Sequence, residues 1–261
     1  MEPDEVYHPD RSLKAKLLRR LVRLHARRSA PGGVLSPMVS FTFDDGHVSA
    51  VRLGAAQLAQ WGFKGTYFVA AGLLERRGGT HASWDDIARL RAEGHEIACH
   101  TFSHLDCGRV CTSTAKIDVD RNRDAFVTHG LAAPDTFAYP FGSLSFGTKA
   151  ALASRFALLR GVHPGMVTQG TDLNQAPAVG IDGDRGKATA CVWLTRAAAR
   201  PAWLILFTHD VCEAPSPWGC TPIALARLAK QAHETGVEVV TVSEGARRLR
   251  VCPDSSLGAR R

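Results

Sequence analysis

Two adjacent carboxylates, Asp44 and Asp45, are the first residues whose types and place in the chain suggest chemistry. They follow the apolar, β-prone residues 39–43 and precede Gly46, which permits a sharp turn. α/β proteins place their chemistry at the carboxyl ends of parallel strands. Two neighbouring carboxylates repel each other unless a cation binds one or a proton is held on the other. The alternative interpretation is a solvated turn, for which Asp-Gly is common.

Histidines follow two further strand-like runs. His100 and His104 come after residues 96–99, and His209 comes after residues 203–208, the most apolar strand-like run of the chain. On one helical turn, His100 and His104 would face the same side and chelate one ion. With a carboxylate from another strand end they would form a His-His-Asp set. Such a set suits a catalytic divalent cation, most simply zinc, with a position left for water.

Cysteine offers an alternative ligand, and its usage also bears on location. Cys99 and Cys107 flank the histidine pair, although Cys99 falls in a strand pattern typical of a core residue. The seven cysteines form an odd, scattered set, and the N-terminal residues show no export-signal pattern. We therefore predict reduced thiols and a cytoplasmic protein. The prediction allows peripheral contact with the inner membrane face. A Cys212–Cys220 disulfide is not expected in that compartment.

The elements that must position these residues alternate between strand and helix. Strands are expected at 38–43, 65–70, 96–99, 135–139, 156–159, 203–208 and 237–242, and helices at 49–61, 85–93, 113–128, 148–154, 184–199, 221–235 and 243–249. Residues 161–182 fit neither pattern. This alternation predicts parallel strands with right-handed crossovers, and about seven strands favour a closed barrel over an open sheet.

Composition and charge set the domain plan. The 261 residues are 45% hydrophobic, and no apolar run is long enough to cross a membrane. We expect a basic extension over 1–36, a catalytic domain over 37–250 and a tail over 251–261.

Residues 11–28 contain eight Lys or Arg and no acidic residue, and four leucines line one face of a predicted helix. This helix could touch an anionic membrane surface. Packing of the leucine stripe on the domain is the favoured alternative. Nothing in the sequence supports nucleic-acid binding.

Four segments of the chain resemble motifs of the polysaccharide deacetylases, the fourth family of carbohydrate esterases, which includes the nodulation-type chitooligosaccharide deacetylases. These segments are Thr-Phe-Asp-Asp-Gly at 42–46, His-Thr-Phe-Ser-His at 100–104, Phe-Ala-Tyr-Pro-Phe-Gly at 137–142 and Leu-Phe-Thr-His-Asp at 206–210. The resemblance implies an α/β fold with a distorted, incomplete barrel of about seven parallel strands. It also implies one divalent metal ion, with Zn2+ expected first and Co2+, Ni2+ or Mn2+ as alternatives.

The resemblance also implies roles for individual residues. Asp44 would be the general base and His209 the general acid, while the backbone N–H of Phe141 would stabilise the oxyanion. The implied metal ligands are Asp45, His100 and His104. The residues expected to contact the N-acetylated saccharide substrate are Tyr139, Pro140, Phe207 and Trp218.

The chain departs from the family pattern at several places. Ala138 stands where the family often has an arginine, so that arginine's effect on the base is expected to be absent. Phe141 stands for the usual Tyr, and Phe207 for the usual Leu, which would narrow the acyl pocket. The family's Asp-Trp motif has no clear counterpart. Asp182 is the candidate to orient His209, with an Asp-Gly turn as the alternative.

The resulting prediction is an amide hydrolase that removes N-acetyl groups from an amino sugar in a saccharide or glycan precursor. A same-fold hydrolase of formamides, cyclic imides or ureides is the first alternative, and a non-catalytic glycan-binding barrel is the second. Asp44 and His209 are both present, which disfavours the non-catalytic barrel. The sequence leaves the oligomeric state open.

Overall fold

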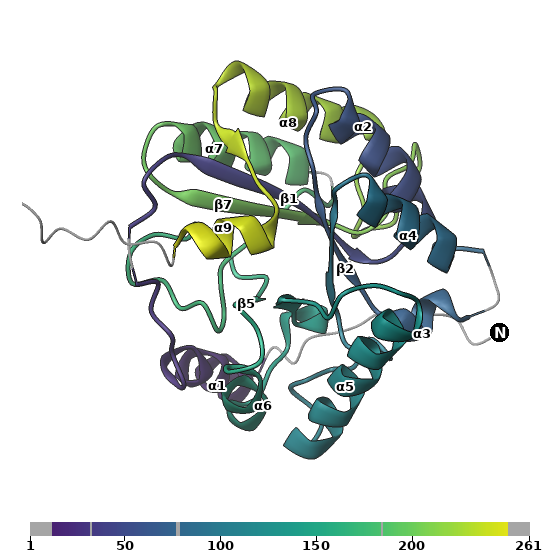
Figure 1. Ribbon diagram of the computed structural model, residues 1–261. Coiled ribbons are helices and arrows are strands. Elements are labelled where there is room, and N and C mark those ends of the chain that lie inside the picture. The colour runs from purple at the N-terminus through teal and green to yellow at the C-terminus, as the bar shows by residue number, and fades with distance from the viewer. Residues whose placement is uncertain (1–11, 32, 77–78, 184, 250–261) are drawn as a thin grey trace, which may run out of the picture.

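A curled parallel sheet with helices around it forms the body of the protein (Figure 1). The computed structural model describes residues 12–249 except 32, 77–78 and 184. All strand pairings are parallel, and the path β5-β4-β3-β2-β1-β7-β6 is joined by β8, which pairs with β1. The strands are β1 Met38–Asp45, β2 Thr66–Val69, β3 Glu96–Cys99, β4 Thr136–Ala138, β5 Leu158–Arg160, β6 Val179–Gly180, β7 Trp203–Thr208 and β8 Glu238–Val239.

Strand β1 lies at the centre of the sheet. It pairs with β7 along Met38–Phe43 on one side. On the other side it pairs first with β8 at Met38 and Val39, and then with β2 from Thr42 to Asp45. Because every pairing is parallel, the carboxyl ends of β1, β3 and β7 meet at one edge of the sheet.

The sheet is an incomplete barrel, as the family resemblance implied, and the closed barrel favoured by the strand count is wrong. The two end strands of the path, β5 and β6, are joined only through the irregular segment between them, where Arg160 makes a single bridge to Ala176. Pro164 and Pro177 lie in this segment and lack the N–H that a sheet ladder needs.

Alternation along the strands divides the apolar side chains into two main cores. Val39 and Phe41 of β1 point outward into the core beneath the helices. Met38 points inward, into a second core that includes Trp203 and residues of α9. Helix α9 therefore fills the inside of the curl at the amino ends of the strands, and the carboxyl ends stay accessible for a site.

The helices follow the predicted positions closely, with some local differences. The α-helices are α1 Leu13–Leu24, α2 Ala55–Ala59, α3 Ala71–Leu74, α4 Trp84–Ala92, α5 Thr112–Thr128, α6 Phe146–Leu152, α7 Gly186–Ala198, α8 Pro222–Glu234 and α9 Val242–Arg248. A π-helix, η1 Ala50–Gly54, begins the predicted 49–61 helix, and a 3-10 turn, η2 Pro140–Gly142, follows β4. Gly54 packs so closely on Phe43 that a Cβ there would lie 2.9 Å from the ring.

The amino-terminal segment is attached to the rest of the protein. Arg28 donates to the carbonyls of Phe156 and Ala157, and Ser29 bridges to Asp172. The prediction that the leucine stripe of α1 packs on the domain is wrong, since its leucines are exposed. No described helix is long and apolar enough to cross a membrane. The predicted tail, 251–261, lies outside the described residues.

Candidate active site

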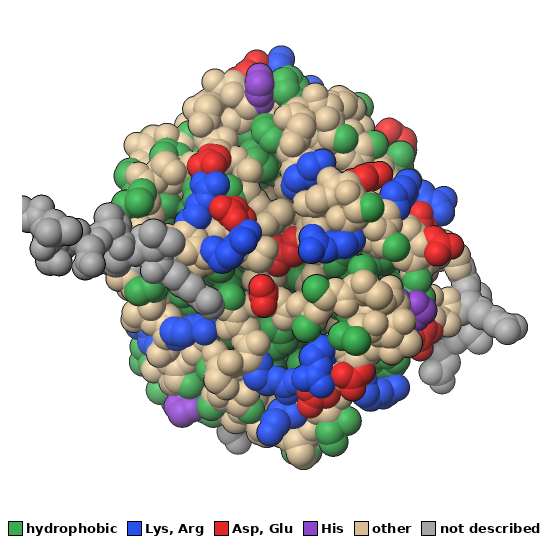
Figure 2. Space-filling view, in the orientation of Figure 1, with side chains coloured by type: hydrophobic (Ala, Val, Ile, Leu, Met, Phe, Trp, Pro, Cys, Tyr) green, Lys and Arg blue, Asp and Glu red, His purple; other side chains and the backbone are tan. Residues whose placement is uncertain are grey.

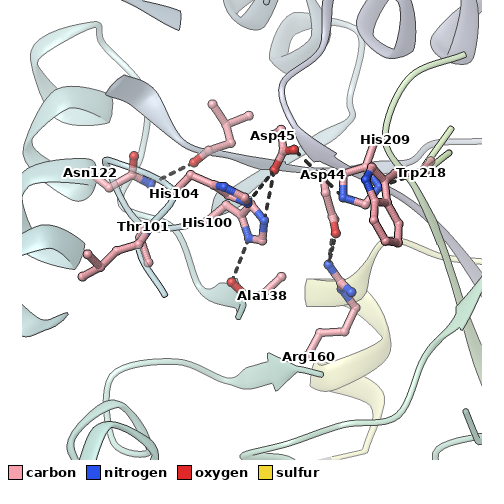
Figure 3. Close-up of polar contacts among 12 residues, drawn as sticks. Asp44, Asp45, His100, Thr101, His104, Asn122, Ala138, Arg160, His209 and Trp218 are labelled. Carbon is pink, nitrogen blue, oxygen red and sulfur yellow. Dashed lines mark hydrogen bonds and ion pairs between the residues drawn. The ribbon is translucent and has the colours of Figure 1, made fainter. Parts of the chain in front are cut away.

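The carboxyl end of β1 turns abruptly and sends its two carboxylates to different partners. Asp45 and Gly46 both adopt left-handed backbone conformations, with φ of 70° and 80°. A Cβ at Gly46 would lie 3.1 Å from Leu74, so glycine suits both the turn and the packing. Figure 3 shows Asp45 facing the histidines and Asp44 facing Arg160.

Asp45, His100 and His104 converge in the way a metal site requires. The Nε2 atoms of both histidines lie 3.2 Å from Oδ1 of Asp45. His100 Nδ1 lies 2.8 Å from the Ala138 carbonyl, which can only accept, so Nδ1 carries the hydrogen and Nε2 presents its lone pair. Asp45 Oδ1 is buried and has no hydrogen-bond donor. This orphaned oxygen beside imidazole nitrogens fits a divalent cation.

Electrostatics keeps these ligands in the binding form. Burial lowers the pKa of His104 to about 4 despite the neighbouring Asp45, so its imidazole is neutral at pH 7. Burial would raise the pKa of Asp45, but His104, His100 and His209 together hold it well below its usual range. Burial raises the pKa of Cys99 to about 11 and that of Cys107 further still. These thiols are therefore protonated, which disfavours the thiolate alternative.

The two histidines come from a loop, and the predicted helical turn is wrong. Thr101 and His104 have positive φ values of 62° and 57°, which no α-helix contains. Asp118 of α5 accepts hydrogen bonds from the backbone N–H groups of Phe102 and Ser103 and from the Ser103 hydroxyl. This side-chain scaffold replaces the helical hydrogen bonds and fixes the spacing of the histidines.

Arg160 of β5 holds Asp44 in place. Its Nη2 atom lies 2.7 and 2.5 Å from the two carboxylate oxygens, and both side chains are buried. The guanidinium also contacts the rings of Phe68 and Phe207. Its Cζ atom lies 5.0 Å from the centroid of each ring. Position 138 is alanine, so the family's arginine is absent there as expected, yet Asp44 still has an arginine partner. A different strand supplies the guanidinium that position 138 does not.

His209 lies on the opposite side of Asp45 from the histidine pair. Its Nε2 atom is 4.0 Å from Oδ2 of Asp45, and its Nδ1 atom is 3.0 Å from the carbonyl of Trp218. Burial would lower the pKa of His209, but Asp45 and Asp44 raise it above its ordinary value. No described hydrogen bond joins Asp182 to His209, so the Trp218 carbonyl takes the orienting place predicted for Asp182.

Comparison with known proteins shows which family this chain resembles. A sequence model for polysaccharide deacetylases matches residues 32–156, which include the Asp-Asp-Gly, His-x-x-x-His and Pro-Phe-Gly segments. Over these residues, which make up just under half of the chain, the protein is similar to the polysaccharide deacetylase family. Members of this family are hydrolases of carbon–nitrogen bonds other than peptide bonds, and the protein is an enzyme of that class.

Solved structures extend the likeness in fold beyond the matched residues. The Xyl-CE4 domain of a multidomain xylanase from the hindgut metagenome of Trinervitermes trinervoides is 18% identical with a TM-score of 0.61, covering 85% of this chain and 95% of that one. The chitin deacetylase of Colletotrichum lindemuthianum is also 18% identical, with a TM-score of 0.61 and coverage of 82% and 89%. A mutant peptidoglycan deacetylase from Bacillus subtilis is 16% identical, with a TM-score of 0.56 and coverage of 83% and 93%.

The remaining residues predicted from the deacetylase resemblance lie in different environments. Phe141 has a φ of 58°, and its ring packs edge-on against His104 with centroids 4.4 Å apart. Pro140 is buried, as is Tyr139, whose hydroxyl donates to the Asn174 carbonyl. The burial of Tyr139 does not favour its predicted contact with substrate.

Phe207 and Asp182 line a cavity of about 480 Å³ at the β6 side of the site. The Trp218 side chain is exposed on the loop that follows β7. Trp218 is thus accessible to a substrate, whereas Phe207 is largely buried and borders the cavity.

Sequence reasoning missed Arg160 and Asp118. Arg160 ends a short strand and Asp118 lies within a helix, and neither belongs to a motif that the resemblance carries. A buried charge in an apolar strand is a signal that could have drawn attention to Arg160, because such a charge needs a partner.

Proposed function

We propose that the protein is a metal-dependent amide hydrolase that removes N-acetyl groups from an amino sugar in a saccharide or glycan precursor. The observation that carries the proposal is the convergence of Asp45, His100 and His104 beside a separate buried carboxylate, Asp44, and a further histidine, His209. A ligand set, a base and an acid are the three components that hydrolysis of an amide needs.

Asp45, His100 and His104 would hold the divalent cation. Zinc suits a carboxylate with two imidazoles, and cobalt, nickel and manganese are the alternatives. When bound, the cation would supply Lewis-acid polarisation of the amide carbonyl. The lone-pair orientation of His100 and the orphaned oxygen of Asp45 support this assignment.

The chain's own residues would carry the protons. Asp44 would accept a proton from the water whose oxygen attacks the carbonyl carbon, and Arg160 keeps its carboxylate oriented. The Nε2 atom of His209 would protonate the departing nitrogen as the carbon–nitrogen bond breaks, giving a free amine and acetate. The backbone N–H of Phe141 is the proposed donor to the oxyanion.

The substrate would enter at the mouth formed near Trp218 and Phe207. The exposed Trp218 ring suits stacking on a sugar, and Phe207 would line the pocket for the acetyl methyl group. Two of the similar structures are a chitin deacetylase and a peptidoglycan deacetylase, which supports an N-acetylated saccharide as the substrate class.

The size of Phe207 supports one second candidate. An aromatic ring beside Arg160 leaves less room for an acyl group than a smaller aliphatic side chain would. This favours a smaller group such as formyl, and hydrolysis of formamides is therefore the alternative activity.

We also propose that the protein acts in the cytoplasm, at or near the inner membrane face. The six described cysteines are free, including Cys212 and Cys220. Free thiols are typical of a reducing compartment and support this location. The basic residues 11–28 support peripheral contact with an anionic membrane.

A metal-reconstituted hydrolysis assay tests the proposed reaction. The purified protein is stripped with a chelator, reloaded with zinc or cobalt, and given N-acetylglucosamine oligomers while acetate and free amine are quantified. We expect acetate release that requires the metal. Formate release from N-formylated analogues without acetate release would favour the alternative. Full activity in the stripped protein would contradict a metal-dependent hydrolase.

A further inference from the structure

Helix α1 turns its leucines away from the protein. Leu13, Leu17, Leu18, Leu21 and Leu24 are between 45% and 83% exposed. We propose that this leucine face docks the protein on the surface of an anionic lipid bilayer. The inference concerns where the protein binds, and it holds whether or not the proposed reaction is correct.

The geometry of α1 separates its two sides. Leu13, Leu17 and Leu24 share one face at a period of 3.6 residues per turn. Val22 lies on the opposite side of the helix and is buried, with 2% of its surface exposed. One side of α1 therefore faces the domain, and the leucine side faces solvent.

A buried lysine fixes this orientation. Lys149 of α6 is fully buried, and its Nζ atom donates to the carbonyl of Val22 at 2.9 Å and pairs with Asp172 at 2.7 Å. It thereby caps the carboxyl end of α1 with a positive charge. The His25 ring also packs edge-on against Phe146, with centroids 5.2 Å apart. Turning the leucines inward would expose Val22 and disturb the hydrogen bond from Lys149 to its carbonyl, so the outward orientation is built into the fold.

Charge selects the partner. Helix α1 contains the basic residues Lys14, Lys16, Arg19, Arg20 and Arg23 and no acidic residue. On the molecular face seen in Figure 2, by contrast, Lys and Arg side chains are interspersed with Asp and Glu. Leucines flanked only by cations match acyl chains beneath anionic headgroups. A helix of 12 residues is too short to span a bilayer, so the match is to its surface.

The position of α1 gives docking a consequence. Its carboxyl end contacts α6, which follows η2, the turn that carries Phe141. Docking would thus hold the rim of the active site near the bilayer. An amino sugar attached to a lipid would meet the site there.

Vesicle flotation of the full chain tests the docking surface. Vesicles of phosphatidylglycerol with phosphatidylcholine are compared with vesicles of phosphatidylcholine alone. We expect the anionic vesicles to bind at least about tenfold tighter, and the Leu17→Ser/Leu21→Ser variant to lose about tenfold or more of that binding. The Lys16→Gln/Arg20→Gln variant should lose the preference for anionic lipid.

Matched variants elsewhere on the surface serve as controls. Ile223 of α8 is exposed to the same extent as Leu17, at 59%, so Ile223→Ser should leave vesicle binding unchanged. Lys116→Gln on α5 is the corresponding control for charge. Unchanged thermal melting of the leucine variant shows that it remains folded.

Three results would overturn the proposal. They are an absence of binding to anionic vesicles, equal binding by wild type and the leucine variant, and leucine-dependent self-association or nucleic-acid binding without vesicle binding. Turnover of a soluble substrate is measured in parallel, so a failure of docking is distinguished from a failure of the proposed reaction.

Discussion

Adjacent residues at the end of β1 have opposite surroundings. Asp45 faces the imidazoles of His100 and His104, and Asp44 faces a guanidinium. The left-handed backbone at Asp45 separates the two side chains, so the carboxylates do not compete for one cation. The sequence showed two carboxylates and a glycine, but it could not show their partners, because Arg160 is 116 residues away from Asp44.

Replacing Arg160 should reveal how strongly the buried pair is coupled. Arg160→Met leaves the buried Asp44 without its partner, which should lower the free energy of unfolding by about 3–5 kcal/mol. The Asp44→Asn/Arg160→Met double variant should recover part of that loss, because no unpaired charge remains. Chemical denaturation of the single and double variants measures both effects.

Arg155→Met is the matched control. Arg155 pairs with Asp120 at a partly exposed site, and loss of such a pair should cost about 1 kcal/mol or less. Equal losses for Arg160→Met and Arg155→Met would show that burial does not strengthen the Asp44 contact.

Among the secondary-structure elements, the spacing of apolar residues predicted most strands and helices, because apolar residues recur at a regular interval within each of them. It failed at residues 100–104, where the His-x-x-x-His spacing fits a helical turn but the chain forms a loop. Spacing alone cannot distinguish the two, since the decisive hydrogen bonds come from Asp118 on another element. It also left residues 161–182 unassigned, and these contain the two-residue strand β6.

The loop contacts predict a role for Asp118 in metal binding. Asp118→Ala removes three hydrogen bonds from residues 102 and 103 and loosens the histidine spacing. Zinc affinity, measured by competition with a chromogenic chelator, should fall about 10–100-fold. Asp120→Ala on the same helix should leave affinity unchanged. A zinc affinity equal to wild type in Asp118→Ala would mean that the loop holds its shape without this scaffold.

At the scale of the whole molecule, stability should decrease in mild acid. Burial, with a contribution from Lys64, lowers the pKa of His95 from 6.5 to about 4. Its Nδ1 atom accepts from the Gly65 N–H, so protonation would place two donors face to face. The unfolded chain binds this proton more readily. Stability is therefore complete above about pH 6.5 and is lost as the pH falls toward 4.

His95→Gln tests this linkage. A glutamine carbonyl can accept from Gly65 without gaining a proton. Between pH 7 and pH 5, the variant should lose about 2 kcal/mol less stability than wild type. Burial also lowers the pKa values of His104 and His163 to about 4, so some pH dependence should persist. The surface variant His233→Gln is the control. If the stability of His95→Gln depends on pH in the same way as that of wild type or of this control, His95 is not responsible for the loss of stability in acid.

The central claim is that Asp44 and Asp45 divide the labour between proton transfer and metal binding. The most direct measurement is the bound-metal content of Asp44→Asn, determined on the same sample as its acetate release. We predict one equivalent of zinc, as in wild type, and turnover reduced by at least about 100-fold. Retained turnover would show that Asp44 is not the base. Loss of the metal together with turnover would show that the two carboxylates are not separate in function.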